Sequence, residues 1–412
     1  MKIPHLVLAV FVAVTTFSPA LLPGADTASS SHYLQAFDAI PPLNPQDRKY
    51  LLEKEWRGHP LDSNAGQLLG QHDREFKLLR EASKSGTAVD WKMNMSAGPF
   101  TPMPQLARAR DLAKLCLLRA RWQLQSRQDA AASEEIITAI QLGSAVSDQS
   151  SMLTASIRLT INDLVCALVA ERWFELKNET VQDVLKALDR KPIGGTFASV
   201  IRSEKIISYD WLLRIIKEAQ AKFPADDKKA LQSVSEQIHP IFPDPQNQGA
   251  PIETQIITAA GNTTAGLTRY VTAIGPLYTE LEQVFRMPYP ECKGAAEALD
   301  RKISTHTNLF VRQILPKVWD NRERELRSEA FVAMLHAALE MRLDPAKAAS
   351  AIANPNGTGP FLSTRFLLDG SDRGFKLKSN LPFKQIEPAI IFTEKTGPGF
   401  MVMGAKIGQK VP

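Results

Sequence analysis

The chain has 412 residues, of which 44% are hydrophobic and 23% charged, and its formal net charge is +5. This composition is typical of a globular protein, and the length allows a large core shared by more than one folded unit. From Phe361 to the end, eight lysines and arginines stand against four acidic residues. A basic tail can contact nucleic acid, an anionic polymer or a membrane surface, but a solvated β surface is the simpler interpretation.

The first twenty residues have the pattern of a secretory signal peptide. Lys2 supplies the positive start, Leu6 to Phe17 the apolar segment, and Ser18-Pro19-Ala20 a small-residue cleavage site. The alternative is an uncleaved N-terminal anchor, although twelve apolar residues are short for a membrane span. We expect cleavage after Ala20, a secreted or periplasmic protein, no integral membrane segment in the mature chain and no nucleic-acid partner.

Residues 21–45 are rich in serine and proline, and we expect a flexible lead-in there. A first helix is then predicted from Asn44 or Gln46 to Trp56, and a second from Asn64 to Ala82. Residues 83–104 should form a loop, which Trp91 and Phe100 hold against the helices. A helical-hairpin domain is predicted over residues 46–239 as a whole.

Three helices with short connections are predicted between Gln105 and Glu175, and such helices must run antiparallel. They cover about 105–124, 130–145 and 150–176. In the first, apolar side chains recur every three or four residues and so share one face. The other face should be wet, because it carries a series of cations: Arg108, Arg110, Lys114, Arg119 and Arg121.

The remaining helices follow between proline and glycine breaks. Helices are predicted at 179–188, from a cap at Thr196 to about Phe223, and from Asp226 to His239. Residues 240–251 contain four prolines and form the clearest linker. A second helical segment, 252–343, should contain helices at 252–286 with a break near 275, at 291–303, and at 309–343 with a kink at Pro316.

From Asp344 onward, glycines separate short β segments. Arg365–Leu368 and Phe375–Ser379 flank a turn, and Ala389–Thr393 and Phe400–Gly404 flank a second one, which predicts two hairpins. The fold class is therefore mostly α, with a small antiparallel β tail at 344–412 packed on a long helix. The helices form either an irregular, tetratricopeptide-like array of hairpins or an irregular bundle.

Three segments carry a resemblance to a known group of proteins. They are Arg119-Ala120-Arg121 within a long helix, the joint Met287-Pro288-Tyr289-Pro290-Glu291, and the strand Gly397-Pro398-Gly399-Phe400-Met401-Val402. Together they resemble secreted bacterial helical-repeat-like proteins of unknown function that end in a small pilin-like β region. The resemblance implies an architecture and supplies no catalytic residues. The chain also differs from true pilins, because its N-terminus lacks the prepilin pattern.

The three cysteines form an odd set for an oxidising compartment. Cys116 and Cys166 lie on apolar helix faces, where we expect buried free thiols, with a bridge between them as the alternative. Cys292 stands beside a helix start and should be more accessible. No zinc-binding spacing occurs, and no cofactor is expected.

Two weak candidate sites remain. Glu329 is the nearest match to a general acid of a cell-wall hydrolase, but its neighbours Arg322, Arg324 and Arg327 should lower its pKa, which is the wrong direction for an acid. His336 and Glu340 are four residues apart on one helix and could share a metal ion, although a structural histidine is the simpler interpretation.

The first hypothesis is therefore an exported, non-enzymatic binding or scaffold protein of the cell envelope. It would bind a protein or peptide partner in grooves between helices. The second is a hydrolase of a cell-wall polymer, and the third an accessory protein of a secretion or pilus-like apparatus. The sequence does not fix an oligomeric state.

Overall fold

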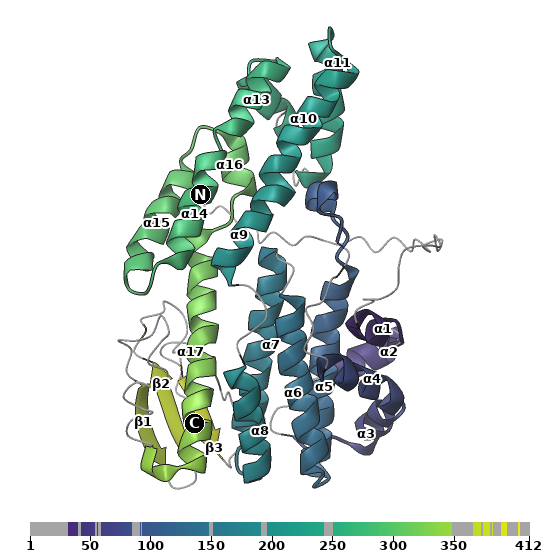
Figure 1. Ribbon diagram of the computed structural model, residues 1–412, viewed down its shortest axis with the longest axis vertical. Coiled ribbons are helices and arrows are strands. Elements are labelled where there is room, and N and C mark those ends of the chain that lie inside the picture. The colour runs from purple at the N-terminus through teal and green to yellow at the C-terminus, as the bar shows by residue number, and fades with distance from the viewer. Residues whose placement is uncertain are drawn as a thin grey trace. The chain divides into compact units, whose positions relative to one another are not determined.

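The computed structural model describes residues 32–39, 43–53, 56, 59–84, 91, 93–147, 151–190, 196–242, 250–347, 366–371, 374–379, 381, 389–393 and 403. The predicted signal peptide lies outside the described residues, as do most of the Pro-rich segment and most of the second hairpin's return strand. Within the described part the fold is mostly helical with one small antiparallel sheet, which confirms the predicted class (Figure 1).

The first helix, α1 (His32–Ala39), lies in the segment that we expected to be a flexible lead-in, so that expectation is wrong there. Tyr33 and Phe37 are one turn apart, and their rings pack against Trp91, with the Phe37 and Trp91 ring centres 5.5 Å apart. Trp91 also donates from its indole nitrogen to the Ala145 carbonyl at 3.1 Å. An aromatic pair at helical spacing thus gives this short helix a buried face, which packs on helix α4.

The next segments form shorter pieces than predicted. The helix expected up to Trp56 consists of α2 (Pro45–Arg48) and one π-helical turn (Lys49–Glu53). The helix expected at 64–82 is two helices, α3 (Ser63–Gly70) and α4 (Asp73–Lys84). Gly66 permits the close approach of α3 to α5, because a Cβ there would come within 2.3 Å of the Trp122 side chain.

The predicted helical hairpins of the central stretch are present almost at their expected bounds. They are α5 (Pro104–Gln125), α6 (Asp129–Val146), α7 (Met152–Glu171) and α8 (Asn178–Asp189). A capping box between Ser151 and Thr154 begins α7. Helix α5 contacts α6 and α7 along its length and also meets α3 and the π-helical turn.

The predicted wet face of α5 is absent from the second half of the helix, whereas in the first half Arg110 is exposed and Arg108 and Lys114 are half-buried. Arg119 and Arg121 are only 8% and 7% exposed. Leu117 and Leu118, which directly precede them, are buried as well. The reason is that elements from both sides of the sequence cover α5. A helix in the middle of a bundle can keep cations only if acidic partners accompany them inside.

After α8 the chain forms a long, interrupted helical path. Thr196 caps α9 as predicted. The path comprises α9 (Phe197–Lys205), the π-helix η3 (Ile206–Asp210) and α10 (Trp211–Lys222), and α11 (Asp227–Ile238) follows with a 3-10 turn (His239–Ile241). Upstream of α5, the predicted loop contains the 3-10 helix η2 (Met95–Phe100), which contacts η3 and α10.

The helices beyond the Pro-rich segment return to pack on the first ones. They are α12 (Ile252–Ala259), α13 (Thr264–Thr272), α14 (Gly275–Arg286), α15 (Glu291–Ser304), α16 (Leu309–Ile314) and α17 (Val318–Leu343), with a final 3-10 turn (Pro345–Lys347). The helix expected at 309–343 is broken between Ile314 and Val318. Helix α17 packs on α7, α8 and α15, so residues from both sides of the Pro-rich segment share one core.

The sheet has the order β1-β2-β3, and neighbouring strands are antiparallel. Its strands are β1 (Phe366–Ser371), β2 (Gly374–Ser379) and β3 (Ala389–Thr393). Leu368 pairs with Leu377, and Leu377 with Ile390, while Met403 forms one further bridge to Ile390. The sheet packs on α17, as predicted, and also on the end of α7, where the Trp173 and Phe392 ring centres are 4.7 Å apart.

Candidate functional site

Glu329, the candidate general acid, lies on α17, and its electrostatic environment is opposite to the one predicted. The Oε2 atom is enclosed and has no hydrogen-bond partner. Burial, followed by the charge of Glu325, raises the pKa of Glu329 to about 7, although Arg322 and Arg158 act against that change. The expected lowering of this pKa is therefore wrong. A buried carboxyl loses the hydration that stabilises its ionised form. The arginines that neighbour Glu329 in the sequence do not compensate for this loss.

Two of those neighbouring arginines are engaged elsewhere. Arg324 donates to the Ser156 carbonyl at 3.1 Å and to the Thr160 hydroxyl at 2.8 Å, both on α7. The charge of Arg327 acts on Asp163, also on α7. Helical neighbours thus point in different directions, and proximity along the chain overestimated their influence on Glu329.

The remaining neighbours of Glu329 form a tight buried cluster. Glu325 accepts from the Phe197 backbone N–H at 2.7 Å and from Arg322 at 2.6 Å. Cys292 on α15 belongs to the same cluster and is fully buried, so the accessibility predicted for it is wrong. Burial raises the pKa of the Cys292 thiol, against the influence of Arg322. Cys116 and Cys166 are free and buried, as expected.

His336 and Glu340, the candidate metal ligands, form part of a contact between α17 and α8. The His336 Nε2 atom lies 2.7 Å from an Asp189 carboxylate oxygen, whereas its Nδ1 atom lies 4.0 Å from Glu340. Among the described residues, no group of three or more histidine, cysteine or acidic side chains could hold a metal ion. The geometry supports a helix-to-helix hydrogen bond at His336.

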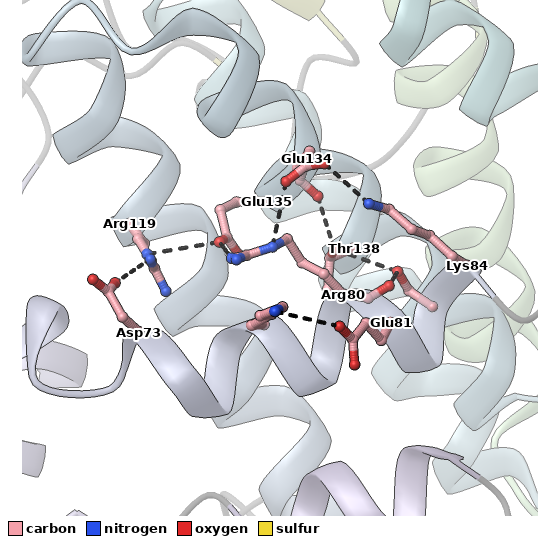
Figure 2. Close-up of polar contacts among 10 residues, drawn as sticks. Asp73, Arg80, Glu81, Lys84, Arg119, Glu134, Glu135 and Thr138 are labelled. Atoms are coloured by element: carbon pink, nitrogen blue, oxygen red, sulfur yellow. Dashed lines mark hydrogen bonds and ion pairs between the residues drawn. The ribbon is translucent and has the colours of Figure 1, made fainter.

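The second buried cluster, which we call the α5 ionic cluster, joins α4, α5 and α6 (Figure 2). Arg119 binds Asp73 of α4 and lies 3.6 Å from the Glu135 carboxylate of α6. Arg80 of α4 binds the same Glu135, which is fully buried. Burial raises the pKa of Glu135, and the two arginines oppose that increase. The Arg119 guanidinium also stacks on the Phe76 ring, 4.6 Å from its centre.

Arg121 extends this pattern to α7. It binds Glu171, whose side chain is 3% exposed, and donates to the Trp56 carbonyl at 2.7 Å. Each buried arginine of α5 thus has an acidic partner on another helix. These ion pairs cross-link the bundle, although Arg119 Nη1 and Glu135 Oε2 are buried without a hydrogen-bond partner among the described residues.

An apolar surface is the feature that the fold leaves open to a partner. Four large hydrophobic side chains are exposed in the described part of the chain: Phe100 at 45%, Leu153 at 52%, Phe174 at 44% and Ile206 at 44%. Phe100 ends η2, Leu153 lies in the first turn of α7, and Ile206 begins η3. Two contacts relate these elements: η2 packs on η3, and α7 packs on α9, the helix that runs directly into η3. We call Phe100, Leu153 and Ile206 the junction surface.

Specific contacts fix the junction surface. Glu204, in the last turn of α9, accepts from the Met152 N–H at 2.6 Å and so joins the start of α7 to the end of α9. The Ser151 hydroxyl lies 3.9 Å from the Met103 sulfur, which joins α7 to the start of α5. The Phe100 and Trp211 ring centres are 5.9 Å apart. The surface is therefore held by contacts from several segments.

Gly98 sets the local backbone at this surface. Its φ is +64°, a conformation that side-chain-bearing residues rarely adopt, and a Cβ there would come within 2.3 Å of the Trp211 side chain. The methionines Met93, Met95, Met103 and Met152 are half-buried on the surrounding segments. Methionine is flexible and polarizable, and it is common on surfaces that bind apolar partners.

Sequence reasoning did not find the junction surface. Leu153 has the spacing of the core stripe of α7, and Phe100 was expected to hold a loop against the helices, yet both side chains are exposed. Ile206 lies in a π-helix, which shifts the helical face relative to a regular 3.6-residue repeat. The concentration of methionines between 93 and 103 is the signal that could have indicated it.

Comparisons with family models, with curated protein sequences and with solved structures find no match to this chain. Helix α7 is long and apolar enough to cross a membrane by length and composition. Its contacts with α5, α6 and α17 are also those of a core helix, and 56% of its most apolar stretch is buried among them.

Proposed function

We propose that this protein is an exported, non-enzymatic binding or scaffold protein of the cell envelope, and that the junction surface binds an apolar segment of a partner protein. Export rests on the signal-like pattern of residues 1–20. The binding role rests on one observation: three of the four large apolar side chains that are exposed in the described part of the chain lie on η2, α7 and η3, which the η2–η3 and α7–α9 contacts relate to one another.

The surface has the properties of a binding site for a protein segment. Its apolar side chains supply the area whose burial stabilises a complex, and the half-buried methionines can adapt to the shape of a partner. The elements that carry the surface are held together by the Glu204–Met152 hydrogen bond and by the Phe100–Trp211 ring contact. A surface that is already ordered loses less conformational entropy on binding.

Site-specific photocrosslinking tests this proposal. A photoreactive phenylalanine analogue replaces Leu153 in one variant and Phe174 in another, and each is exposed to an envelope extract from the native organism. We expect one discrete crosslinked protein from position 153 and none of the same mass from position 174. An excess of unlabelled wild-type protein should abolish the product, whereas an excess of Leu153→Ser should not. Identical products at both positions would contradict the assignment of the surface.

A second candidate function, hydrolysis of a cell-wall polymer, has one observation in its favour. The pKa of Glu329 is raised to about 7, the direction that a general acid requires. However, its Oε2 is enclosed between helices, where a polymer has no access without a rearrangement. A zymogram on cell-wall substrate decides the question: a clearing zone for the wild type that Glu329→Gln removes would establish this role.

A third candidate, an accessory role in a secretion or pilus-like apparatus, rests on the sheet that packs against the long helix α17. This arrangement is the part of the pilin-like resemblance that the described residues contain. Deletion of residues 344–412 should then impair localisation or assembly of that apparatus. Normal assembly with the truncated protein would remove this candidate.

A further inference from the structure

Two acidic side chains face one another across a turn of α17, at the place where this helix attaches to the earlier part of the chain. Glu325 and Glu329 are four residues apart and therefore neighbours on one helix face. Both oxygens of Glu325 are engaged, one by the Phe197 N–H at the start of α9 and the other by Arg322. The Oε2 atom of Glu329 is enclosed without a donor.

The charged and thiol groups around the pair come from three helices. Helix α17 contributes Arg322, α7 contributes Arg158, and α15 contributes the Cys292 thiol, whose pKa responds to both Arg322 and Glu329. Phe197 of α9, whose backbone N–H binds Glu325, also packs its ring on that of Phe285 of α14, with ring centres 5.7 Å apart. Helix α7 also carries an acidic group, Asp163, whose carboxylate accepts a hydrogen bond from the Ser328 hydroxyl at 2.8 Å.

This geometry favours a neutral Glu329. A protonated carboxyl needs no cation, does not repel Glu325, and carries no charge into the enclosed position of Glu329. An ionised carboxylate at the same place would be a second negative charge beside Glu325, with one oxygen that receives no hydrogen bond.

We propose that Glu325 and Glu329 form a proton-responsive joint, in which a proton on Glu329 holds α17 against α7 and α9 and its release loosens that attachment. The chemical step is the transfer of one proton from the Glu329 carboxyl to water, and no other reactant takes part. The inference is independent of any partner at the junction surface.

The direction of the pH effect follows from linkage. Burial raises the pKa of Glu329 from its ordinary 4.5 to about 7. Between these values the folded protein binds more protons than the unfolded chain, so its stability falls as the pH rises. The stabilisation is complete below about pH 4.5 and is lost once the pH exceeds about 7.

Thermal unfolding of the full chain at pH 5.5 and pH 8.5 tests the proposal. Wild-type protein should lose more thermal stability over this interval than Glu329→Gln, with a difference in Tm of roughly 2–4 °C. At pH 8.5 the Gln variant should be the more stable of the two, because it removes the buried charge. The control variant is Asp320→Asn. Asp320 lies on the same helix but is exposed, so the Tm of this variant should change with pH as that of the wild type does.

Hydrogen exchange at the Phe197 amide provides a test that requires no variant. After correction for intrinsic base catalysis, its protection in the wild-type protein should fall by about tenfold or more between pH 6 and pH 8. Amides within the α5–α6 hairpin should change much less. A local loss at Phe197 distinguishes loosening of the joint from a general decrease in stability.

Two results would overturn the proposal. One is a Glu329→Gln variant with the same pH-dependent fall in Tm as the wild type. The other is a Phe197 amide whose corrected protection is constant from pH 6 to pH 8. Neither result would bear on the photocrosslinking at position 153, so failure of the joint and failure of the binding function are distinguishable.

Discussion

The α5 ionic cluster and the junction surface depart from the usual placement of residues in opposite ways. In the first, arginines and glutamates lie inside the bundle: Arg121 and Glu171 are both buried. In the second, large apolar side chains lie outside, and Leu153 is more than half exposed. The difference is whether the chain itself supplies a partner. Each buried arginine meets an acidic side chain of another helix, whereas the exposed apolar side chains are left available to another molecule.

This comparison separates residues that build the fold from residues that are free to serve a function. A buried ion pair is essential once formed, because removal of one member leaves an uncompensated charge. An exposed apolar side chain contributes little to folding, and a group of them on neighbouring elements, rather than any single one, is what the proposed binding role rests on. The two regions should therefore respond very differently to substitution.

The largest effect is expected for Arg121→Met. This change removes the closer of two cations near Glu171 and leaves Arg172 3.8 Å from its other carboxylate oxygen, and we expect a loss of about 3–5 kcal/mol in the free energy of unfolding. Urea denaturation at neutral pH measures it. The double variant Arg121→Met/Glu171→Leu should recover much of the loss, because it removes both charges.

An exposed ion pair serves as the control for this prediction. Lys84 binds Glu134 at 3.0 Å, but its side chain is 63% exposed. Lys84→Ala should change the stability by about 1 kcal/mol or less. If Arg121→Met were equally mild, the buried cluster would not cross-link the bundle as described.

An intermediate effect is expected for Gly98→Ala at the base of the junction surface. The alanine must adopt a positive φ and displace the Trp211 side chain, which should destabilise the protein by about 1–3 kcal/mol. Gly70→Ala is the matched control, since a Cβ there meets no atom within 4 Å. Denaturation of both variants decides whether the close fit is real, because equal stabilities would contradict it.

The smallest effect on stability is expected for Leu153→Ser. Since this side chain is already exposed, the free energy of unfolding should change by about 0.5 kcal/mol or less. Binding should respond strongly, and an excess of this variant should not compete for the partner in crosslinking. Phe174→Ser is the control, with similar exposure but a position outside the junction surface. A large loss of stability in Leu153→Ser would place the residue in the core instead.

Local sequence patterns predicted the helices well and their environments poorly. The apolar spacing in α5 to α8 gave bounds within a few residues of those observed, because that spacing is a property of the segment itself. The glycine-rich turn likewise located β1 and β2. The fate of Arg121 depends on Glu171, fifty residues later in the chain, and no local pattern contains that pairing.

The same limit explains the error at Glu329. Its sequence neighbours include Arg324, and a local count of charges gives a lowered pKa. The increase depends on burial and on the direction of each arginine, which are properties of the packed bundle. Chemical environment is thus the part of a site that helix periodicity does not encode.

The position of the C-terminal sheet has a consequence for the order of folding. Trp173 at the end of α7 is covered by Phe375 and Phe392, which lie about two hundred residues further along the chain. Neighbouring hairpins such as α5–α6 close short loops and form early, whereas distant contacts form late. A ribosome therefore releases almost the whole chain before the Trp173 indole can be shielded, and until then the nascent protein presents an aromatic surface to chaperones.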